Sequence, residues 1–564
     1  MSISTFYGLE VARRGIMTQQ AALYVTGHNI SNANTPGYTR QRVNFEATQA
    51  YPPVGRDNAK IPGQMGTGVQ AGDIQRIRDS FVDTQFRGET SKLGYWDAKS
   101  AMLSQMEDIM NEPSDTGLTK SLDGFWNSLQ DLASQPQNSG ARRVVRQRGI
   151  ALANTFNYLN SSLKAVQKDY RNELGITESR VNSLLRQINQ VNKQIGAIEP
   201  NGYLPNDLYD KRDSLVDELS SYVNIKVEAK ASGGLSSVKA EGLYNIYLTT
   251  PQGDILKDSN GKEIKLIDAI DDSSGTSVFN NTAYGIHINY ENRSEDDSPV
   301  QSITFLQLNE QKAGFVIRDG EGNLKTIEEN SVDADNTTSL KYQLDSFSAL
   351  NTNGKLKGFI EGYGYTEGSE KKGLFNEMLA DLDTMVYTFA TEFNRVHKAG
   401  WSLNEISNNA NDDDFDFFDL GGLTDATGAA SKIKVAKAII DSVDNIAAAE
   451  EASIGNGSNA LKLANVKDTI LTYGDSDTSA ATFFQGMIGS LGDQASEANR
   501  MTEIAATLQS SVDQRRMSIS NVSLDEEMTN MIKFQHAYNA AARQITLVDE
   551  ILDKIINGMG LAGR

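Results

Sequence analysis

The sequence predicts a mainly α-helical protein with an inserted β domain, in which helices from the two ends of the chain pair with each other. Three observations carry this prediction. Apolar residues recur at helical spacing at both ends and through much of the body. Between residues 225 and 370 the pattern changes to short β-type runs separated by turn dipeptides. Only 10 prolines occur in 564 residues, which favours long uninterrupted elements.

Composition limits the function before any motif is considered. The 74 acidic and 53 basic residues give a net charge of −21, which argues against nucleic acid or an anionic membrane as a partner. The chain has no cysteine, so disulfides, cysteine-ligated zinc and thiol catalysis are excluded. No stretch approaches the roughly 20 apolar residues of a membrane span, so we expect no such span.

The first helix is expected over residues 3–31. Large apolar residues recur every seven positions and form a heptad-like seam. The helix should end before Pro36, because the residue preceding a proline disfavours the α conformation. A polar exit and a turn follow. The N-terminal seam residues expected to make packing contacts are Leu9, Ile16, Leu23 and Ile30.

The last helix is expected to begin near residue 523 and to end at glycines close to the C-terminus. Its seam alternates spacings of four and three residues over about five heptads. A second row (Phe534, Ala541, Val548, Ile555) flanks the seam, so the apolar face is too broad for one partner helix. The residues expected to make contacts here are Leu524, Met528, Met531, Phe534, Tyr538, Ile545, Leu552 and Ile556.

Two amphipathic helices at opposite ends predict a discontinuous terminal domain, formed by residues 1–60 with 515–564. Polar residues interrupt both seams, so a free monomer would have to expose these faces or leave them disordered. An ordinary intramolecular hairpin remains open. The breadth of the C-terminal stripe favours packing between subunits.

The body is predicted to be a helical rod or bundle formed by residues 61–224 with 371–514. Its longest helix, over residues 141–199, would span about 88 Å at ~1.5 Å per residue, a length more typical of a spacer or assembly element than of an enzyme core. Shorter helices are expected at 80–111, 117–134, 206–222 and 374–397, with a small β or mixed piece near residues 400–450.

Residues 225–370 are predicted to form a β-rich outer domain inserted into this helical body. Short apolar runs alternate there with turn signals, which is typical of hairpins. The strongest runs and turns are Tyr244 to Leu248, Ile286 to Tyr290, Ile303 to Leu308, Asn260-Gly261 and Asp319-Gly320.

No motif in the chain indicates catalysis or metal binding. The four histidines are isolated and lack the paired spacing of a zinc site. The acidic run from Asp412 to Asp416 would need glycine and glutamate where Phe417 and Leu423 stand to form a calcium loop. We therefore expect no catalytic residue, no cofactor and no metal. A secreted enzyme in the β insertion would have His287 as its only histidine.

Four segments in order along the chain resemble flagellar proteins. Gly27 to Arg40 resembles the signature shared by flagellar rod, hook and hook-associated proteins, and Val522 to Arg543 looks like the matching C-terminal signature. Leu122 to Ala133 and Asp210 to Leu219 resemble the hook-associated protein 1 family, which forms the first hook–filament junction. On this resemblance, the N-terminal motif residues that enter assembly are Asn29, Asn32, Asn34, Thr35, Pro36, Gly37 and Tyr38.

The resemblance implies a structural protein of the bacterial flagellum that lies outside the cell. It would be exported unfolded by the flagellar type III apparatus without signal cleavage, although a chain without a signal peptide otherwise indicates the cytoplasm. The implied partners are a ring of like subunits, the hook protein below, the second junction protein above, and an export chaperone on the helix from Leu524 to Met559. Another axial component, such as the second junction protein or the hook protein, is disfavoured by the chain length and by Phe125-Trp126.

Overall fold

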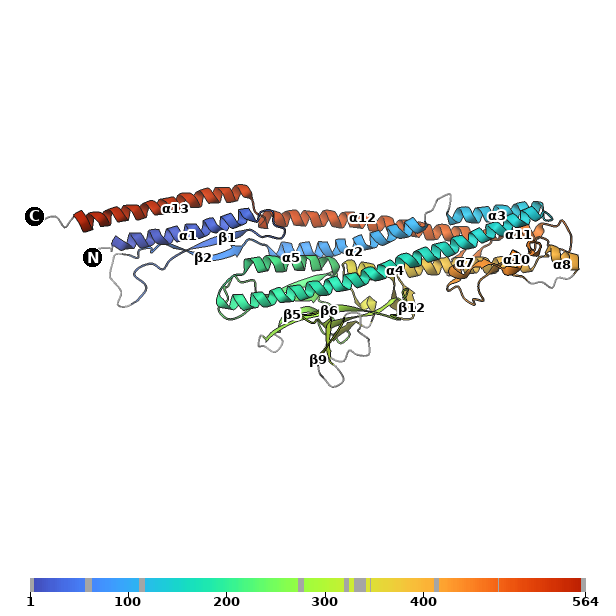
Figure 1. The fold of residues 1–564 in the computed structure, drawn as a ribbon, viewed down its shortest axis with the longest axis horizontal. Coiled ribbons are helices and arrows are strands. Elements are labelled where there is room, and N and C mark those ends of the chain that lie inside the picture. The colour runs from blue at the N-terminus through green and yellow to red at the C-terminus, as the bar shows by residue number, and fades with distance from the viewer. Residues whose placement is uncertain are drawn as a thin grey trace, which may run out of the picture.

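The structure is a computed structural model that describes residues 5–55, 63–110, 117–271, 278–318, 324–328, 341–344, 346–409, 415–474 and 476–558. It shows an elongated, mainly helical molecule with a strand-rich domain on one side of its middle (Figure 1). The predicted fold class is confirmed, including the pairing of the N- and C-terminal helices. Within the described ranges, no helix is long and apolar enough to cross a membrane.

Long helices form the body. The longest, α4 (Ser139–Ile198), runs for 60 residues without a break, as its apolar stripe predicts (Figure 1). The helices α3 (Leu118–Ser134), α5 (Asn206–Tyr222) and α7 (Leu374–Lys398) pack on α4. The remaining pair, α2 (Ser80–Met110) and α12 (Ala480–Ser520), lies side by side. Every helix predicted for the body up to residue 397 is present, with boundaries within two residues of those expected.

Aromatic side chains form the core of the body at the end far from the chain termini. Phe125 of α3 is fully buried, and its ring centroid lies 5.4 Å from those of both Trp126 and Phe393. Phe417 and Phe418 each lie 5.7 Å from it. The Phe125-Trp126 pair singled out in the sequence therefore joins α3 to α7 and to the segment that precedes β13 (Phe418–Asp419).

A smaller mixed piece follows α7, near residues 400–450 as expected. Asp416, the described end of the acidic run, pairs with Lys398 at 3.0 Å, while Asp412 to Asp414 lie outside the described residues. The elements of this mixed piece, and those between it and α12, are α8 (Leu403–Asn408), β13, α9 (Ala429–Lys432), β14 (Lys434–Val435), α10 (Lys437–Asp441), α11 (Ser458–Asn465), β15 (Leu471–Tyr473) and β16 (Ser476–Thr478).

His397, near the end of α7, is buried as a neutral ring. Its side chain is 2% exposed. The Nδ1–H donates to the Phe415 carbonyl at 2.9 Å, and Nε2 accepts the Ala447 N–H at 3.0 Å. Burial lowers the pKa of His397 from 6.5 to about 4, because a charged ring would lose its hydration.

This burial predicts a pH dependence of stability. Between pH 6.5 and about 4 the unfolded chain binds a proton at His397 that the folded chain does not. The contribution of neutral His397 to the free energy of unfolding is therefore fully present above pH 6.5. It is lost as the pH falls towards 4, by up to about 3 kcal/mol. His397→Gln keeps a donor and an acceptor but does not titrate, so it should flatten the curve of unfolding free energy against pH in urea titrations. An unchanged slope would contradict the assignment.

The strand-rich domain is an eight-stranded sheet in the order β12-β11-β7-β6-β5-β4-β3, with β10 also paired to β7. Neighbouring strands are antiparallel except β11 and β7. The strands are β3 (Ile225–Lys230), β4 (Leu243–Leu248), β5 (Lys265–Asp271), β6 (Val278–Tyr290), β7 (Val300–Gln307), β10 (Lys341–Leu344), β11 (Tyr365–Glu367) and β12 (Glu370–Lys372).

Of the two turns predicted in the strand-rich domain, one lies within the described residues and the other does not. Asn260-Gly261 forms a turn in which the Gly261 N–H donates to the Asp258 carbonyl at 2.9 Å. The hairpin of β8 (Phe315–Arg318) and β9 (Leu324–Ile327) is present, but its turn at Asp319-Gly320 lies outside the described residues.

Asparagines on one face of α4 hold the sheet. Asn182 makes a two-way bond with the backbone of Ile286, donating at 3.0 Å and accepting at 2.8 Å. Asn189 donates to the Asn281 carbonyl at 2.9 Å, and Asn192 donates to the Tyr244 carbonyl at 3.0 Å. The strand-rich domain is therefore bonded along the side of α4.

One helix lies where only β-type runs were expected. The helix α6 (Lys355–Tyr363) packs on α2. Glycines at every fourth position allow this contact: a Cβ at Gly358 would lie 2.8 Å from the Tyr95 carbonyl oxygen. Glycine is a weak helix former, so the residues that permit the packing also hide the helix in the sequence.

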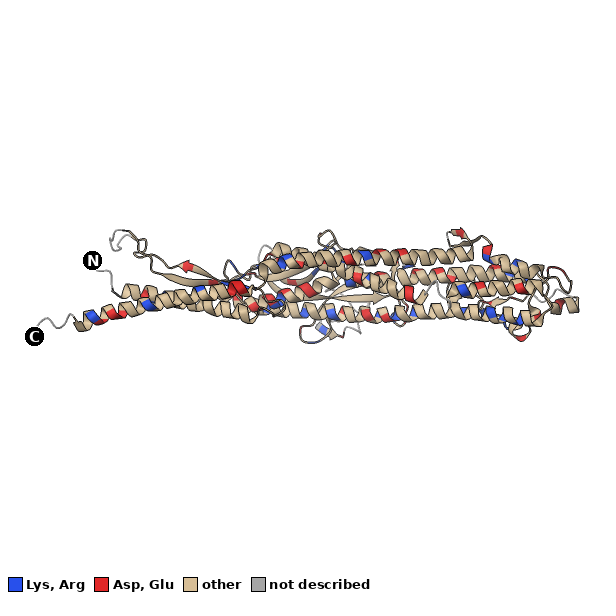
Figure 2. Ribbon diagram, turned by 90° about the horizontal axis from the view of Figure 1, so that it is seen from above, with Lys and Arg blue, Asp and Glu red and all other residues tan. Residues whose placement is uncertain are grey.

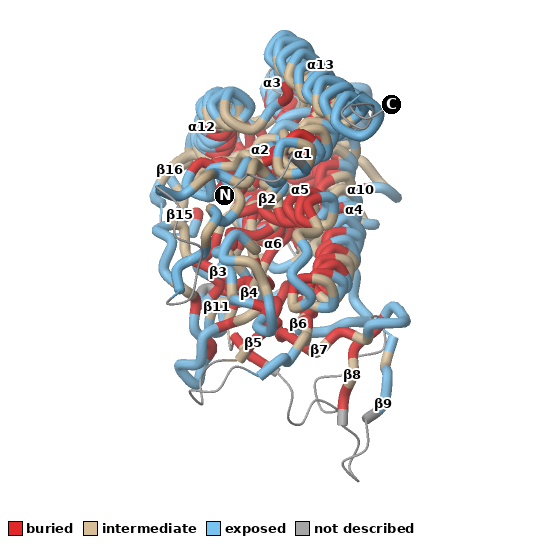
Figure 3. Tube along the Cα trace, turned by 90° about the vertical axis from the view of Figure 1, so that its left-hand side faces the viewer, coloured by how far each residue is buried: buried red, intermediate tan, exposed pale blue. Residues whose placement is uncertain are grey.

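The two chain ends form an arm that extends from the body (Figure 1). Its elements are α1 (Thr5–Ser31), the antiparallel strands β1 (Gln41–Ala47) and β2 (Val69–Arg76), and α13 (Leu524–Asp553). Seen end on, α13 is mostly exposed along its outer side and partly buried where it faces α1, whereas the core of the body is buried (Figure 3).

Candidate assembly site

The terminal helices α1 and α13 pair antiparallel along a seam to which α1 contributes small residues. A Cβ at Gly8 would lie 3.7 Å from Val548 Cγ2, and one at Gly15 would lie 3.7 Å from Ala541 Cβ. Phe534 packs against the cluster that contains Ala22. Contacts on both helices thus recur every seven residues. The four pairs of the seam are Gly8–Val548, Gly15–Ala541, Ala22–Phe534 and Asn29–Glu527.

The predicted N-terminal seam residues border this contact row. Leu9, Ile16, Leu23 and Ile30 each follow a contact residue by one position, and all four are partly buried. Periodicity alone selects the large apolar residues, whereas the close approach of the helices is made by the small ones beside them.

On α13, the row that contacts α1 is the one described in the sequence as flanking. Phe534, Ala541 and Val548 belong to it. The other predicted residues are therefore left beside or outside the pair. Met531, Tyr538, Ile545 and Leu552 are partly buried, and Leu524, Met528 and Ile556 are exposed.

Large apolar side chains remain exposed on both helices of the arm. Tyr24 is 77% exposed and Ile556 is 70% exposed. Large apolar side chains that gather on one exposed element are typical of a surface that another protein covers. The exposed set is Phe6, Met17 and Tyr24 on α1, with Leu524, Met528, Ile532, Leu547, Ile551, Ile555 and Ile556 on α13 and its last turn.

The exit motif after α1 folds into a turn held by its own polar groups. The Thr35 N–H donates to the Asn32 carbonyl at 2.9 Å, and the Thr35 hydroxyl donates to Asn32 Oδ1 at 3.2 Å. Gly37 has φ +78°, a left-handed conformation that favours glycine. Asn34, Thr35, Pro36 and Gly37 are exposed at the tip of this turn.

Asn29 connects the two signature segments. Its Nδ2 donates to the Gln41 carbonyl at 2.8 Å and to Glu527 Oε2 at 3.2 Å. Its Oδ1 accepts the Gln41 N–H at 3.0 Å and the Tyr38 hydroxyl at 2.8 Å. Arg40 Nε donates to Glu527 Oε1 at 2.8 Å. The N-terminal and C-terminal signatures, recognised separately in the sequence, thus meet in space.

Tyr38 keeps its proton in this arrangement. Burial, followed by the nearby carboxylates of Asp210, Asp207 and Glu527, raises its pKa well above the usual value. The hydroxyl therefore stays a donor to Asn29, and its oxygen takes the hydrogen bond from His28 Nδ1 at 2.9 Å. Asn29 and Tyr38 of the N-terminal motif therefore make the hydrogen bonds that connect α1 to the segment after it.

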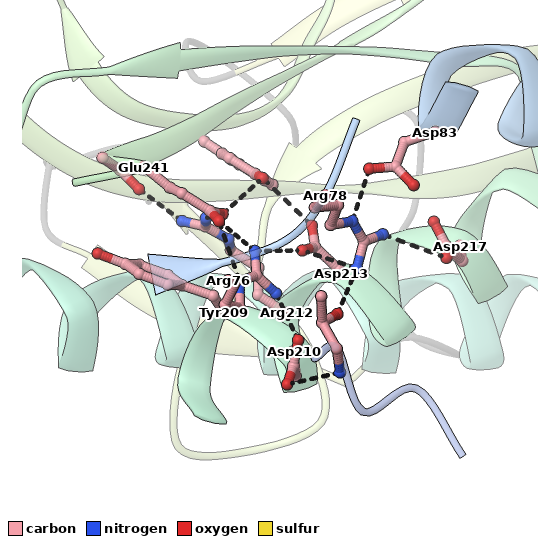
Figure 4. A network of polar contacts seen from close by, with 12 residues as sticks. Arg76, Arg78, Asp83, Tyr209, Asp210, Arg212, Asp213, Asp217 and Glu241 are labelled. Carbon is pink, nitrogen blue, oxygen red and sulfur yellow. Dashed lines mark hydrogen bonds and ion pairs between the residues drawn. The ribbon is translucent and has the colours of Figure 1, made fainter. Parts of the chain in front are cut away.

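Acidic and basic residues occur along the whole length of the molecule (Figure 2). A buried network of arginines and carboxylates lies where the arm meets the body, and Figure 4 shows it from close by. Asp213 of α5 is its centre and is 1% exposed. It pairs with Arg76 at 2.8 Å, Arg78 at 3.2 Å and Arg87 at 3.3 Å. Burial alone would raise the pKa of Asp213, but the arginines around it, led by Arg78, outweigh burial and hold that pKa well below its usual range.

The network joins elements that are far apart in sequence. Arg76 ends β2, Arg87 lies on α2, and Arg516 of α12 pairs with Asp217 at 2.6 Å. The sequence offered one signal, the segment Asp210 to Leu219, but it could not show which arginines face it. The members are Arg76, Arg78, Asp83, Arg87, Asp210, Arg212, Asp213, Asp217, Glu241 and Arg516.

The carboxylates of the Asp213 network pair with arginines of the same network. Among the residues that the structure describes, no group of three or more His, Asp or Glu side chains is placed to hold a metal ion.

The two matching ends define the class of the protein. Residues 9–39 match the family described as "Flagella basal body rod protein", and residues 513–558 match "Flagellar basal body rod FlgEFG protein C-terminal". The first range contains most of α1 with its exit motif, and the second contains the end of α12 and all of α13. The chain is therefore a structural component of the axial type found in bacterial flagella.

The particular family follows from the body. Residues 103–298 match "Flagellar hook-associated protein FlgK helical domain". The chain is 45% identical to flagellar hook-associated protein 1 of Bacillus subtilis over 565 residues, which cover 100% of both chains. It is 26% identical to that of Salmonella typhimurium, covering 97% of this chain and 98% of the relative. The chain belongs to the flagellar hook-associated protein 1 family.

A solved structure shares the fold. The flagellar hook junction protein FlgK from Burkholderia pseudomallei aligns with a TM-score of 0.54, covering 78% of this chain and 100% of that one. The two sequences are 13% identical in this alignment, so the likeness concerns the fold alone.

Proposed function

We propose that the chain forms the first ring of subunits at the junction between flagellar hook and filament, and that it acts by assembly rather than catalysis. The observation that carries this proposal is the arm. Its helices use one row of small residues to pair with each other and leave large apolar side chains such as Tyr24 and Ile556 uncovered. Neighbouring subunits would cover these faces in a ring.

The proposal includes an arrangement of the parts. Residues 1–60 with 515–564 form the inner tube, residues 61–224 with 371–514 form the next layer, and residues 225–370 lie outside. The hook protein lies below the ring and the second junction protein above it. Another axial role, such as that of the second junction protein, is disfavoured by the full-length likeness to hook-associated protein 1.

Export precedes assembly in this proposal. The flagellar type III apparatus carries the unfolded chain out of the cell without signal cleavage. Before that, an export chaperone covers α13, whose exposed apolar residues would otherwise attract other chains. The mature protein is extracellular.

A clean deletion in the source bacterium tests the junction role. Electron microscopy should show bare hooks, and flagellin should appear in the culture medium, because the filament has no base on which to grow. Filaments of normal length would overturn the proposal. Expression of the intact chain from a plasmid should restore filaments, which controls for effects on neighbouring genes.

Leu524→Asp should block incorporation without unfolding the chain. Leu524 is 47% exposed at the first turn of α13, so an aspartate there is compatible with the helix and favoured by its dipole. The charge would, however, be buried when a neighbouring subunit packs on this face. An immunoblot should find the variant in the medium and not in sheared flagella. Ile545→Asp, beside the seam, should behave in the same way.

The matched control is Asn539→Asp, the same negative charge at an exposed polar position of α13. It should enter flagella normally. Normal filament growth with Leu524→Asp would count against burial of this face in the assembly.

A further inference from the structure

We propose that the outer face of α4 on one subunit packs against the outer face of α12 on the next subunit. This inference rests on the ring proposed above and names the surfaces that join its neighbours. The two helices lie on opposite sides of the body, and each has an exposed side that faces away from the core (Figure 3). Opposite sides of one molecule meet when copies are related by rotation, and such head-to-tail contacts close into a ring.

The outer face of α4 is mostly uncharged and carries large apolar side chains. Tyr158 is 67% exposed and Ile176 is 62% exposed. Asp169 is the one charged residue of this face. Exposed apolar side chains gathered along one side of a helix are typical of a surface that another protein covers. The exposed residues of the face are Val144, Gln147, Ala151, Asn154, Tyr158, Ala165, Asp169, Asn172 and Ile176.

The outer face of α12 has room for a large side chain near its start. A Cβ at Gly486 or at Gly489 would meet nothing within 4 Å, so both glycines are open to the surface. Glycine weakens a helix, but it allows a group from outside to approach the backbone closely. Further along α12, Arg500 and Ile504 are exposed. The side chain of a neighbour's Tyr158 fits over the two glycines.

The two faces lie at the same position along the length of the molecule. Gln167 of α4 donates to the Tyr363 carbonyl at 2.8 Å, and the residue before Tyr363 lies against α2. Two positions from this contact, α2 bonds to Asn499 of α12. Tyr158 lies nine residues before Gln167. Gly489 lies ten residues before Asn499, so Tyr158 and Gly489 are level to within about one helical turn.

The single charge on the α4 face has a counterpart on α12. Both helices begin far from the arm and run towards it (Figure 1). Asp169 follows Tyr158 by 11 residues, and Arg500 follows Gly489 by 11 residues, so Tyr158 over Gly489 brings Asp169 to Arg500. Among the described residues, neither Asp169 nor Arg500 forms an ion pair within its own chain. Complementary charges of this kind select the partner and fix the register of a contact.

The apolar residues match over a longer interval. Ile176 follows Tyr158 by 18 residues, and Ile504 follows Gly486 by 18 residues. Eighteen residues are five helical turns, so the two members of each pair lie on the same side of their helix. The contact therefore buries the tyrosine at one end and an isoleucine pair at the other, with the ion pair between them. Apolar groups within a polar surround are the usual composition of an interface between proteins.

Paired cysteines test this contact in assembled flagella, because the chain has no cysteine of its own. Ala165 of α4 and Ser496 of α12 are exposed and level, and replacing them leaves the tyrosine, the ion pair and the isoleucines unchanged. Sheared flagella with Ala165→Cys and Ser496→Cys in every chain are oxidised and run on a gel without reductant. Neighbouring subunits should be linked into a ladder of dimers and larger oligomers.

The matched control moves the second cysteine along the same helix. Ser511 is also exposed on α12, but it lies 15 residues beyond Ser496, or about 22 Å. Ala165→Cys with Ser511→Cys should therefore give at least about tenfold less linked dimer, since the two sulfurs are beyond disulfide reach. Either cysteine alone should leave monomers, because ring neighbours present different faces to each other.

Two results would overturn the proposed contact. One is monomer alone from assembled chains that carry Ala165→Cys and Ser496→Cys. The other is an equal ladder from the control pair. The junction role is tested separately by where the chain is found. A chain that enters flagella but stays monomeric contradicts the contact between α4 and α12 alone, whereas filaments that grow while the chain remains in the medium contradict the junction role.

A charge swap tests the same contact without cysteines. Arg500→Asp places two carboxylates against each other at every ring contact, so the amount of chain in sheared flagella should fall by about tenfold. Adding Asp169→Arg to Arg500→Asp restores opposite charges and should restore incorporation. Both residues are exposed, so neither change should unfold the chain. Equal loss in the single and double variants would overturn the proposal, and so would normal incorporation of Arg500→Asp.

Discussion

Asp213→Ala should lower the free energy of unfolding by about 3–5 kcal/mol, because it removes the shared counter-charge of several buried arginines. Asp213 contacts Arg76, Arg78 and Arg87, and the side chain of Arg76 is 2% exposed. Other carboxylates in the network cannot reach all three. Urea titration followed by circular dichroism measures the loss.

The control for Asp213→Ala is Asp131→Ala, an exposed aspartate on α3. Its stability should remain within about 0.5 kcal/mol of the parent. A loss below about 1 kcal/mol for Asp213→Ala would mean that water or a neighbouring carboxylate replaces the missing charge.

The pKa of Asp213 also determines the direction in which the free energy of unfolding changes in acid. The folded-state pKa of Asp213 lies below its unfolded value. Its contribution is therefore complete above the unfolded pKa of about 3.9 and is lost as the pH falls from there towards the folded value. The stability of Asp213→Ala should accordingly fall less steeply than that of the parent below about pH 4.

Phe125→Ala should be about as severe, at roughly 3–5 kcal/mol, because it leaves a cavity in the middle of a rigid aromatic cluster. The Phe125 ring is fully buried and contacts four other aromatic rings from three segments. Those segments belong to different parts of the chain and cannot close on the space together. Thermal unfolding should show a clearly lower midpoint.

Phe81→Ala on α2 provides the comparison for the same chemical change. Phe81 is 65% exposed, so its removal should alter the midpoint little. Equal losses in the two variants would show that the cluster is not a core.

The sequence predicted what depends on local repetition. The apolar stripe of residues 141–199, which no proline interrupts, predicted a helix of this length to within two residues at each end. In contrast, α6 was missed because its glycines, which admit the Tyr95 carbonyl, weaken the helical signal. In α6 the close contact with α2 requires glycine, whereas a recognisable helical pattern requires larger residues at the same positions.

The assembly site shows the same division. Family resemblance identified both signature segments, and the stripes predicted two helices that pair. The contact row could not be read from them, since Gly8 and Gly15 carry no apolar signal of their own. The Asp213 network was missed for a different reason. Its arginines come from β2, α2 and α12, and charges so far apart in sequence show no pattern until the fold brings them together.

The unbroken helix α4 also separates the part of the subunit that carries axial force from the part that does not. Force applied along the molecule passes through hydrogen-bonded turns from one end of α4 to the other, like load through a strut. The strand-rich domain hangs from the side of that strut by asparagines such as Asn182 and Asn192. It therefore adds bulk without bearing axial load, and its loops are free to lengthen or shorten while the span of the subunit stays the same.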